Sequence, residues 1–271
     1  MIPSIATVTL GGDLPGRINA AAEAGFQAIE LFDSDLQEFG ESPARVKQLA
    51  DAAGLRIASY FPLRDVDGVP EVDVIATRTR AAAYLDQAVE LGAQMVMMCT
   101  ATNKESSSSR SLIVNNLLYL ADMAKERNLR LAYEALSWGR HTFDYRDAAT
   151  LVRKVNHSHF GLVLDSFHIF ARGHTTDEIT KIPAEHIFLV QVSDTLQLNI
   201  DYLEWSRHHR TLPGRGVVDL QAFTAQVRAT GYDGVFSLEC FSDELKTASA
   251  SAIAEAGFTS MSNLWSADYT C

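Results

Sequence analysis

Four short apolar runs in the second half of the chain end at polar side chains that could bind a cation. The runs LAYE, GLVLD, IFLVQ and VFSLE end at Glu134, Asp165, Gln191 and Glu239. Three carboxylates brought to one place repel one another and are costly to desolvate, and a divalent cation between them removes both costs. Oxygen ligands suit Mg²⁺, with Mn²⁺ or Co²⁺ as alternatives, and the lack of cysteine or paired histidine ligands makes zinc less suitable. Taken singly, each acidic residue has an ordinary alternative, which is to cap the next helix.

The metal prediction needs a fold that brings these four positions together, and a repeated pattern predicts one. Segments such as AAEAGFQAIEL and AVELGAQMVMM combine a helical stretch, a glycine that suits the left-handed end of a helix, and a β-rich run. Strands are expected near 4–9, 28–32, 57–61, 95–99, 130–134, 161–165, 187–191 and 235–239. Helices are expected near 14–24, 43–53, 73–91, 110–127, 145–155, 177–182, 219–229 and 245–264.

Strands that alternate with helices predict a parallel sheet, and eight such units predict a single-domain (β/α)8 TIM barrel over residues 1–271. A doubly wound open sheet is the alternative. It predicts a glycine-rich phosphate loop after the first strand, and TLGGDLPGR lacks the GxGxxG spacing. In a barrel, chemistry takes place at the C-terminal ends of the strands. The four polar residues would then come from consecutive strands at one mouth.

Charge and composition exclude several classes of function. The chain has 271 residues and a formal net charge of −11, which argues against a nucleic-acid surface. No apolar run reaches the roughly 18 residues that a membrane helix needs, so no membrane partner is expected. Three cysteines without metal-type spacing indicate a reduced cytoplasmic protein. Nothing in the sequence specifies an oligomeric state.

Longer stretches resemble the xylose isomerase-like barrel superfamily and, within it, the 3-dehydroshikimate dehydratases. The superfamily resemblance is carried by the four polar strand ends and by PGRG at 213–216. The dehydratase resemblance covers residues 4 to about 245 and includes AGFQAIELFDSDL, YEALSWGRH, LDSFHIFARG, WSRHHR and SLECFSDE. It implies a metal site made of the same four residues. Three positions depart from the pattern and put substrate orientation and rate in doubt: Phe61, His209 and Cys240.

The resemblance implies a metal-dependent lyase of quinate and shikimate breakdown. Such an enzyme removes water from 3-dehydroshikimate through a metal-stabilised enediolate and gives protocatechuate. A proton must be moved beside the ring, and His168 and Glu134 are the candidates. Imidazole titrates near neutrality, and a ligating carboxylate can also shuttle protons. The alternative for His168 is a histidine that only caps the next helix.

The small-molecule substrate carries a carboxylate, and cations at the barrel mouth are its expected partners. Arg64 and Arg210 are expected to bind it with paired hydrogen bonds, with Ser206 as a neutral donor. A sugar or inositol isomerase or epimerase on the same barrel is the alternative, since it needs the metal but no carboxylate clamp. A metal-dependent endonuclease would need a histidine-rich metal cluster and a basic face, and the sequence shows neither. A non-catalytic binding protein is the remaining alternative.

Overall fold

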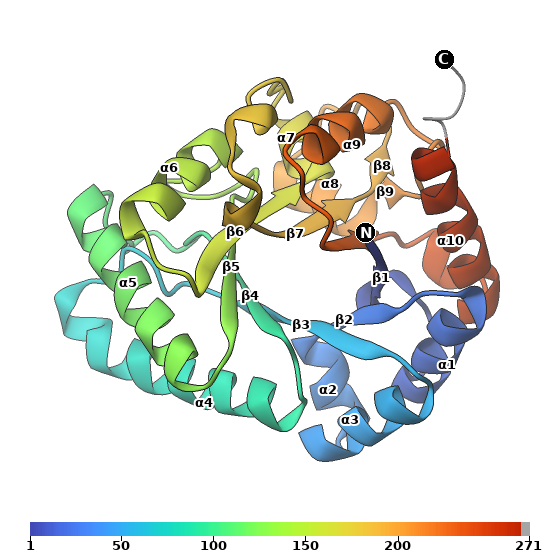
Figure 1. Cartoon of the computed structure of the whole chain (residues 1–271), viewed down its shortest axis with the longest axis horizontal. Helices are drawn as coiled ribbons and strands as arrows, with labels where there is room; N and C mark the ends of the chain where they lie inside the picture. Colours follow the sequence, from blue (N-terminus) through green and yellow to red (C-terminus); the bar gives the residue numbers. More distant parts are fainter. Residues whose placement is uncertain (267–271) are drawn as a thin grey trace.

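Eight parallel strands close into a barrel in the computed structural model, which describes residues 1–266 (Figure 1). They are β1 (Ile2–Ala6), β2 (Ala28–Phe32), β3 (Arg56–Leu63), β4 (Met95–Cys99), β5 (Arg130–Glu134), β6 (Phe160–Asp165), β7 (Ile187–Val192) and β10 (Val235–Leu238). Each pairs with the next barrel strand along the chain, and β1 pairs with β10 to close the ring. The predicted (β/α)8 barrel is confirmed, and the open sheet is excluded. Residues 267–271 of the predicted domain, with Cys271, lie outside the described residues.

The predicted long helices surround the strands (Figure 1). They are α1 (Leu14–Ala24), α3 (Pro43–Ala52), α4 (Val74–Glu90), α5 (Arg110–Glu126), α6 (Tyr145–Val155), α9 (Leu220–Ala229) and α10 (Ala250–Ser266). Local sequence sets their ends: the Asp13 side chain accepts a hydrogen bond from the Gly16 amide at 2.8 Å, and Gly25 closes α1 with a φ of 103°. Within residues 1–266, no helix combines the length and apolarity needed to span a membrane.

Several short elements differ from the prediction. Helices α2 (Asp33–Phe39), α7 (Ser166–Ala171) and α8 (Tyr202–His208), and an antiparallel pair of β8 (Asp194–Thr195) with β9 (Arg210–Thr211), follow strands and were not predicted. They are too short for hydrophobic periodicity to mark them. The first strand ends at Ala6 because a 3₁₀ turn follows it. The helix expected at 177–182 is a 3₁₀ turn, since Ile182 precedes Pro183 and is held in an extended conformation.

The barrel interior changes from apolar to polar along the strands. Side chains two residues apart in a strand face the same side of the sheet. Ala132 and Val163 belong to the apolar cluster inside the barrel. Glu134 and Asp165 follow them by two residues, so they continue the inner face of the barrel to its C-terminal mouth. The period-two alternation of the strands therefore turns these carboxylates inward rather than toward the helices.

Packing at Gly161 gives a test of the strand register. A Cβ on this residue would lie 2.4 Å from the Cγ of Phe188, close to the base of that side chain, so the ring cannot swing aside freely. Gly161→Ala should therefore lower the free energy of unfolding by roughly 1–3 kcal/mol in urea denaturation, because overpacking forces a shift. Gly161→Ala should cost less in a Phe188→Ala background, because the Cγ that the new methyl group would meet is then absent. An unchanged unfolding midpoint for Gly161→Ala would show that β6 and β7 are packed differently.

Candidate active site

The four predicted ligands meet at the C-terminal mouth of the barrel. Glu134 and Asp165 are the last residues of β5 and β6. Gln191 is the second-to-last residue of β7, and Glu239 directly follows β10. These four strands are consecutive around the barrel. Each of the four side chains has 3% or less of its surface exposed. Parallel alignment of neighbouring strands is therefore enough to gather three carboxylates and one amide in a buried cluster.

Arg210 enters this cluster at the start of β9. Its Nη1 donates to Asp165 Oδ2 at 2.8 Å and to Glu239 Oε2 at 2.9 Å. Ser206 anchors the same guanidinium, since its carbonyl oxygen accepts from Nε at 3.1 Å and its hydroxyl accepts from Nη2 at 2.8 Å. Arg210 is only 2% exposed. Its position favours a role in holding two of the carboxylates, and contact with a substrate carboxylate stays a prediction for both Arg210 and Ser206.

Two oxygen atoms in the cluster have no partner. Glu134 Oε1 and Gln191 Oε1 are buried and accept no hydrogen bond from residues 1–266. Buried acceptors are almost always paired, so each such atom needs an explanation. One guanidinium also cannot neutralise three carboxylates. Unpaired oxygens and uncompensated negative charge are what a divalent cation with oxygen ligands would satisfy, and the residues present therefore fit such a cation.

Crowding and burial change the proton affinity of these carboxyl groups. Burial, followed by the charges of Glu239 and Asp165, raises the pKa of Glu134 well above its usual range. Burial raises the pKa of Glu239 to about 8, against the opposing effect of Arg210. Without another cation, burial therefore favours the protonated forms of these two carboxyl groups. A bound cation would displace those protons, so its affinity should increase with pH.

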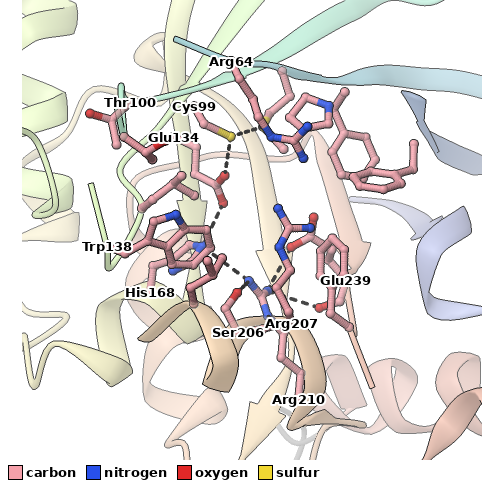
Figure 2. Close-up of a pocket in the computed structure, with 18 residues that line it drawn as sticks. Arg64, Cys99, Thr100, Glu134, Trp138, His168, Ser206, Arg207, Arg210 and Glu239 are labelled. Carbon is pink, nitrogen blue, oxygen red and sulfur yellow. Dashed lines mark hydrogen bonds and ion pairs between the residues drawn. The ribbon is translucent and has the colours of Figure 1, made fainter. Parts of the chain in front are cut away.

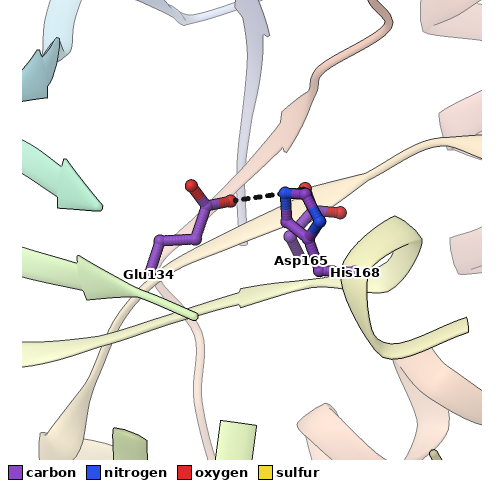
Figure 3. A group of neighbouring side chains, drawn as sticks. All are labelled: Glu134, Asp165 and His168. Carbon is purple, nitrogen blue, oxygen red and sulfur yellow. Dashed lines mark ion pairs between the residues drawn. The ribbon is translucent and has the colours of Figure 1, made fainter. Parts of the chain in front are cut away.

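His168 is the third member of a group with ligand atoms close enough to hold a metal. Its Nε2 lies 3.6 Å from Glu134 Oε1 and 3.5 Å from Asp165 Oδ2, and the three ligand atoms lie within 4.8 Å of one another (Figure 3). The backbone N–H of Ser137 donates to Nδ1 at 3.2 Å. The tautomer with its proton on Nε2 fits this contact and the two carboxylate oxygens near Nε2. In the other tautomer, Nε2 would accept from Arg210 Nη2 at 3.3 Å or serve as a metal ligand.

The surroundings of His168 also keep it neutral. Burial is the main cause that lowers its pKa to about 3, and the positive charges of Arg210 and Arg207 act in the same direction. Arg210 Nη2 lies 3.3 Å from Nε2, where it opposes a further positive charge on the ring. The ring packs edge-on against Trp138 at a centroid distance of 5.2 Å. These surroundings favour a neutral ring, and the role of His168 in moving a proton stays a prediction.

A pocket of about 190 Å³ opens over this cluster (Figure 2). Its lining combines Glu134, Glu239 and His168 with an aromatic wall that includes Phe32, Phe61, Trp138 and Phe241. Among the three departures from the dehydratase pattern, Phe61 lines this pocket, whereas His209 lies on the surface near Glu204 and Cys240 is buried. Phe61 is therefore the departure that is placed to contact a ligand.

Two arginines line the upper part of the pocket. Arg64 is partly exposed, and its single ion pair in residues 1–266, to Asp33, is long at 3.9 Å. Arg207 lies over the ring of Phe241 at 4.5 Å and forms no ion pair with a carboxylate in the described part of the chain. Burial, and then the positive charge of Arg64, lowers the pKa of Arg207. Two guanidinium groups that repel each other across a pocket favour an anion between them.

Arg207 was not among the predicted substrate residues. The segment WSRHHR offers two arginines, and the sequence does not show which one pairs with the carboxylates. The structure ends α8 at His208 and begins β9 at Arg210; both arginines line the pocket, and Arg210 is the one that pairs with the carboxylates. The signal that could have separated the two was a helix of seven residues, Tyr202–His208, with Asp201 as its N-cap.

Comparisons with known proteins agree with this fold. Residues 18–263 match the model of the xylose isomerase-like TIM barrel family. Two curated 3-dehydroshikimate dehydratases, from Pseudomonas putida and Pseudomonas aeruginosa, are 39% and 40% identical to this chain over 258 residues. These matches cover 95% of this chain but 41% of each relative, so the chain spans about two fifths of their length. An inosose isomerase of Bacillus subtilis is 31% identical over 48% of this chain and 47% of its own.

Solved structures show the same barrel. A xylose isomerase-like TIM barrel/4-hydroxyphenylpyruvate dioxygenase fusion protein superposes with a TM-score of 0.95 at 39% identity, over 97% of this chain and 42% of that one. The IOLI protein, solved with a bound zinc atom, superposes with a TM-score of 0.90 over the full length of both chains. At 21% identity, that second likeness is one of fold alone. The match over residues 18–263, together with the relatives that cover nearly all of this sequence, shows that the chain belongs to the xylose isomerase-like TIM barrel family.

Proposed function

We propose that this chain is a metal-dependent 3-dehydroshikimate dehydratase, which removes water from 3-dehydroshikimate to give protocatechuate. The observation that carries the proposal is a single pocket that joins a cluster of buried oxygen ligands to two weakly paired arginines. A substrate with a ketone at one end and a carboxylate at the other would satisfy both groups. The names of the relatives that match nearly the whole chain support this choice of substrate.

Mg²⁺ is the proposed cation, with Mn²⁺ and Co²⁺ as alternatives, because all four proposed ligands offer oxygen. Those ligands are Glu134, Asp165, Gln191 and Glu239. When bound, the cation would act as a Lewis acid on the substrate ketone oxygen, which makes the adjacent C–H more acidic. Arg210 bridges the Asp165 and Glu239 carboxylates by donating to one oxygen of each, which offsets their mutual repulsion.

Glu134 is proposed to move the proton. Its Oε1 lies in the pocket lining without a hydrogen-bond partner in residues 1–266, so a lone pair is available there. Glu134 takes the proton from the carbon beside the ketone and returns it to the departing hydroxyl group, which leaves as water. The electron pair of the C–H bond forms the new ring double bond, and enolisation of the ketone then completes the catechol. His168 retains its proton and donates the Nε2–H to a substrate oxygen.

Arg64 and Arg207 are proposed to bind the substrate carboxylate, and both line the pocket (Figure 2). A guanidinium group offers a carboxylate two parallel hydrogen bonds, which fixes the plane of the substrate as well as its charge. The Ser206 hydroxyl already accepts from Arg210 and retains its own hydrogen for donation. The aromatic wall, which includes Phe61 and Trp138, would then pack against the ring of the substrate.

The clamp predicts a separation of binding from chemistry. Arg64→Met and Arg207→Met should each reduce kcat/KM for 3-dehydroshikimate by about 10- to 150-fold, mainly through KM, because a charge-assisted contact remote from the breaking bond is lost. Arg207→Lys should recover only part of the loss, since it keeps the charge without the paired donors. Arg45→Met, on the exposed face of α3, is the matched control and should leave both constants unchanged. An unchanged KM in both pocket variants would contradict the clamp.

The role of Glu134 predicts a loss of turnover. Glu134→Gln should lower kcat by about 10²–10⁴, because the amide cannot accept the proton. The measurement is the rise in ultraviolet absorbance as the aromatic product forms in the presence of Mg²⁺, and EDTA should abolish that rise. Glu126→Gln, on the exposed end of α5, is the control for loss of a charge. If the unmodified protein turned over a neutral inosose or ketohexose and not 3-dehydroshikimate, the isomerase alternative would replace the dehydratase.

A further inference from the structure

A buried carboxylate lies beneath the proposed metal ligands and has no part in the function described so far. Glu30, in β2, has no exposed surface. Within residues 1–266 it forms no ion pair, which is unusual because a buried charge normally has a partner of opposite sign. Its partners are neutral donors. Such a group is costly to keep, so its contacts deserve a functional explanation.

The contacts of Glu30 fix the orientation of one neighbouring amide. Ser59 Oγ donates to Glu30 Oε2 at 2.7 Å. Gln191 Nε2 donates to Glu30 Oε1 at 3.2 Å and lies 3.4 Å from Oε2. A glutamine side chain presents NH₂ on one side and oxygen on the other, and the two can exchange by a rotation of the terminal amide. Both oxygens of Glu30 lie within hydrogen-bond distance of Gln191 Nε2, so the rotamer in which the NH₂ group faces Glu30 is the one that this contact holds.

The contact with Glu30 also sets the direction of the oxygen atom of the Gln191 amide. With Nε2 directed to Glu30, Gln191 Oε1 faces away from it, and this oxygen has no hydrogen-bond partner in the described chain. The strand register places Gln191 directly beside Asp165 of β6. An amide rotated by half a turn would present two N–H donors to the cluster instead, and N–H groups cannot bind a cation.

We propose that Glu30 is a positioning residue, which holds the amide nitrogen of Gln191 and thereby presents Oε1 to the divalent cation. The inference depends on the cation site proposed above and adds a specific role for a residue that touches neither cation nor substrate. Outer partners of this kind orient first-shell ligands, and their loss commonly weakens metal binding by about 10- to 100-fold.

Cation affinity, measured on the whole chain without substrate, tests this role apart from the dehydratase activity. Glu30→Leu removes the acceptor at similar size and should raise the dissociation constant for Mn²⁺ by about 10- to 100-fold in calorimetry or electron paramagnetic resonance. Glu30→Gln keeps an acceptor oxygen but loses the charge, and its affinity should stay near that of the unmodified protein. If Glu30→Gln weakens Mn²⁺ binding as much as Glu30→Leu does, the charge matters rather than the orientation, and the proposal is wrong.

A second-site change gives an independent readout. In the Glu30→Leu background, Gln191→Glu supplies a carboxylate with an oxygen on either side, which needs no orientation, so Mn²⁺ affinity should be restored. Failure of this rescue in a folded protein would overturn the proposal. Asp35→Leu is the matched control: it removes a buried carboxylate that accepts from Thr7 at 2.6 Å away from the ligands, and should change thermal stability but not Mn²⁺ affinity. Absence of Mn²⁺ binding in the unmodified protein would instead reject the cation site itself.

Discussion

Repulsion among three buried carboxylates at the barrel mouth is the constraint on which the rest of the site depends. Glu134, Asp165 and Glu239 are nearly inaccessible to water, and Arg210 is the cation that directly contacts two of them. Three ionised carboxylates and one guanidinium leave two negative charges, which equals the charge of one divalent cation. The same oxygens otherwise retain protons, as the raised pKa values of Glu134 and Glu239 indicate. Cation and protons therefore compete for one set of ligands.

The buried carboxylates also explain why the arginines of the site have different contacts. Arg210 is buried and donates hydrogen bonds to two of the proposed ligands. Three residues earlier, Arg207 lies over the aromatic wall of the pocket and faces the positive charge of Arg64. One short segment thus supplies a cation to the metal ligands and a second cation to the substrate pocket. Glu30 accepts a hydrogen bond from Gln191 Nε2 and thereby orients the Gln191 amide.

Much of the fold and most of the cluster could be predicted from the sequence, for physical reasons that particular residues illustrate. Glycine at the end of α1 and continuous apolar runs such as β4 mark helix ends and buried strands without tertiary information. Once eight such units are recognised, barrel closure places Glu134 and Asp165 at one mouth. The sequence could not show which arginine of WSRHHR pairs with the carboxylates, because that depends on where the short helix α8 ends and β9 begins. The contact of Glu30 with Gln191 joins residues 161 positions apart, and only the closed barrel reveals it.

The competition between cation and protons can be measured directly as the number of ions bound and the number of protons released in one titration. Metal-free protein should be titrated with Mn²⁺ near pH 7 by calorimetry, in buffers that differ in their enthalpy of ionisation. The account predicts one ion bound per chain with a net release of protons to the buffer, and tighter binding as the pH rises, because the cation displaces protons from carboxyl groups such as Glu239, whose pKa is about 8. Binding that released no protons and did not depend on pH, or no binding at all, would contradict it.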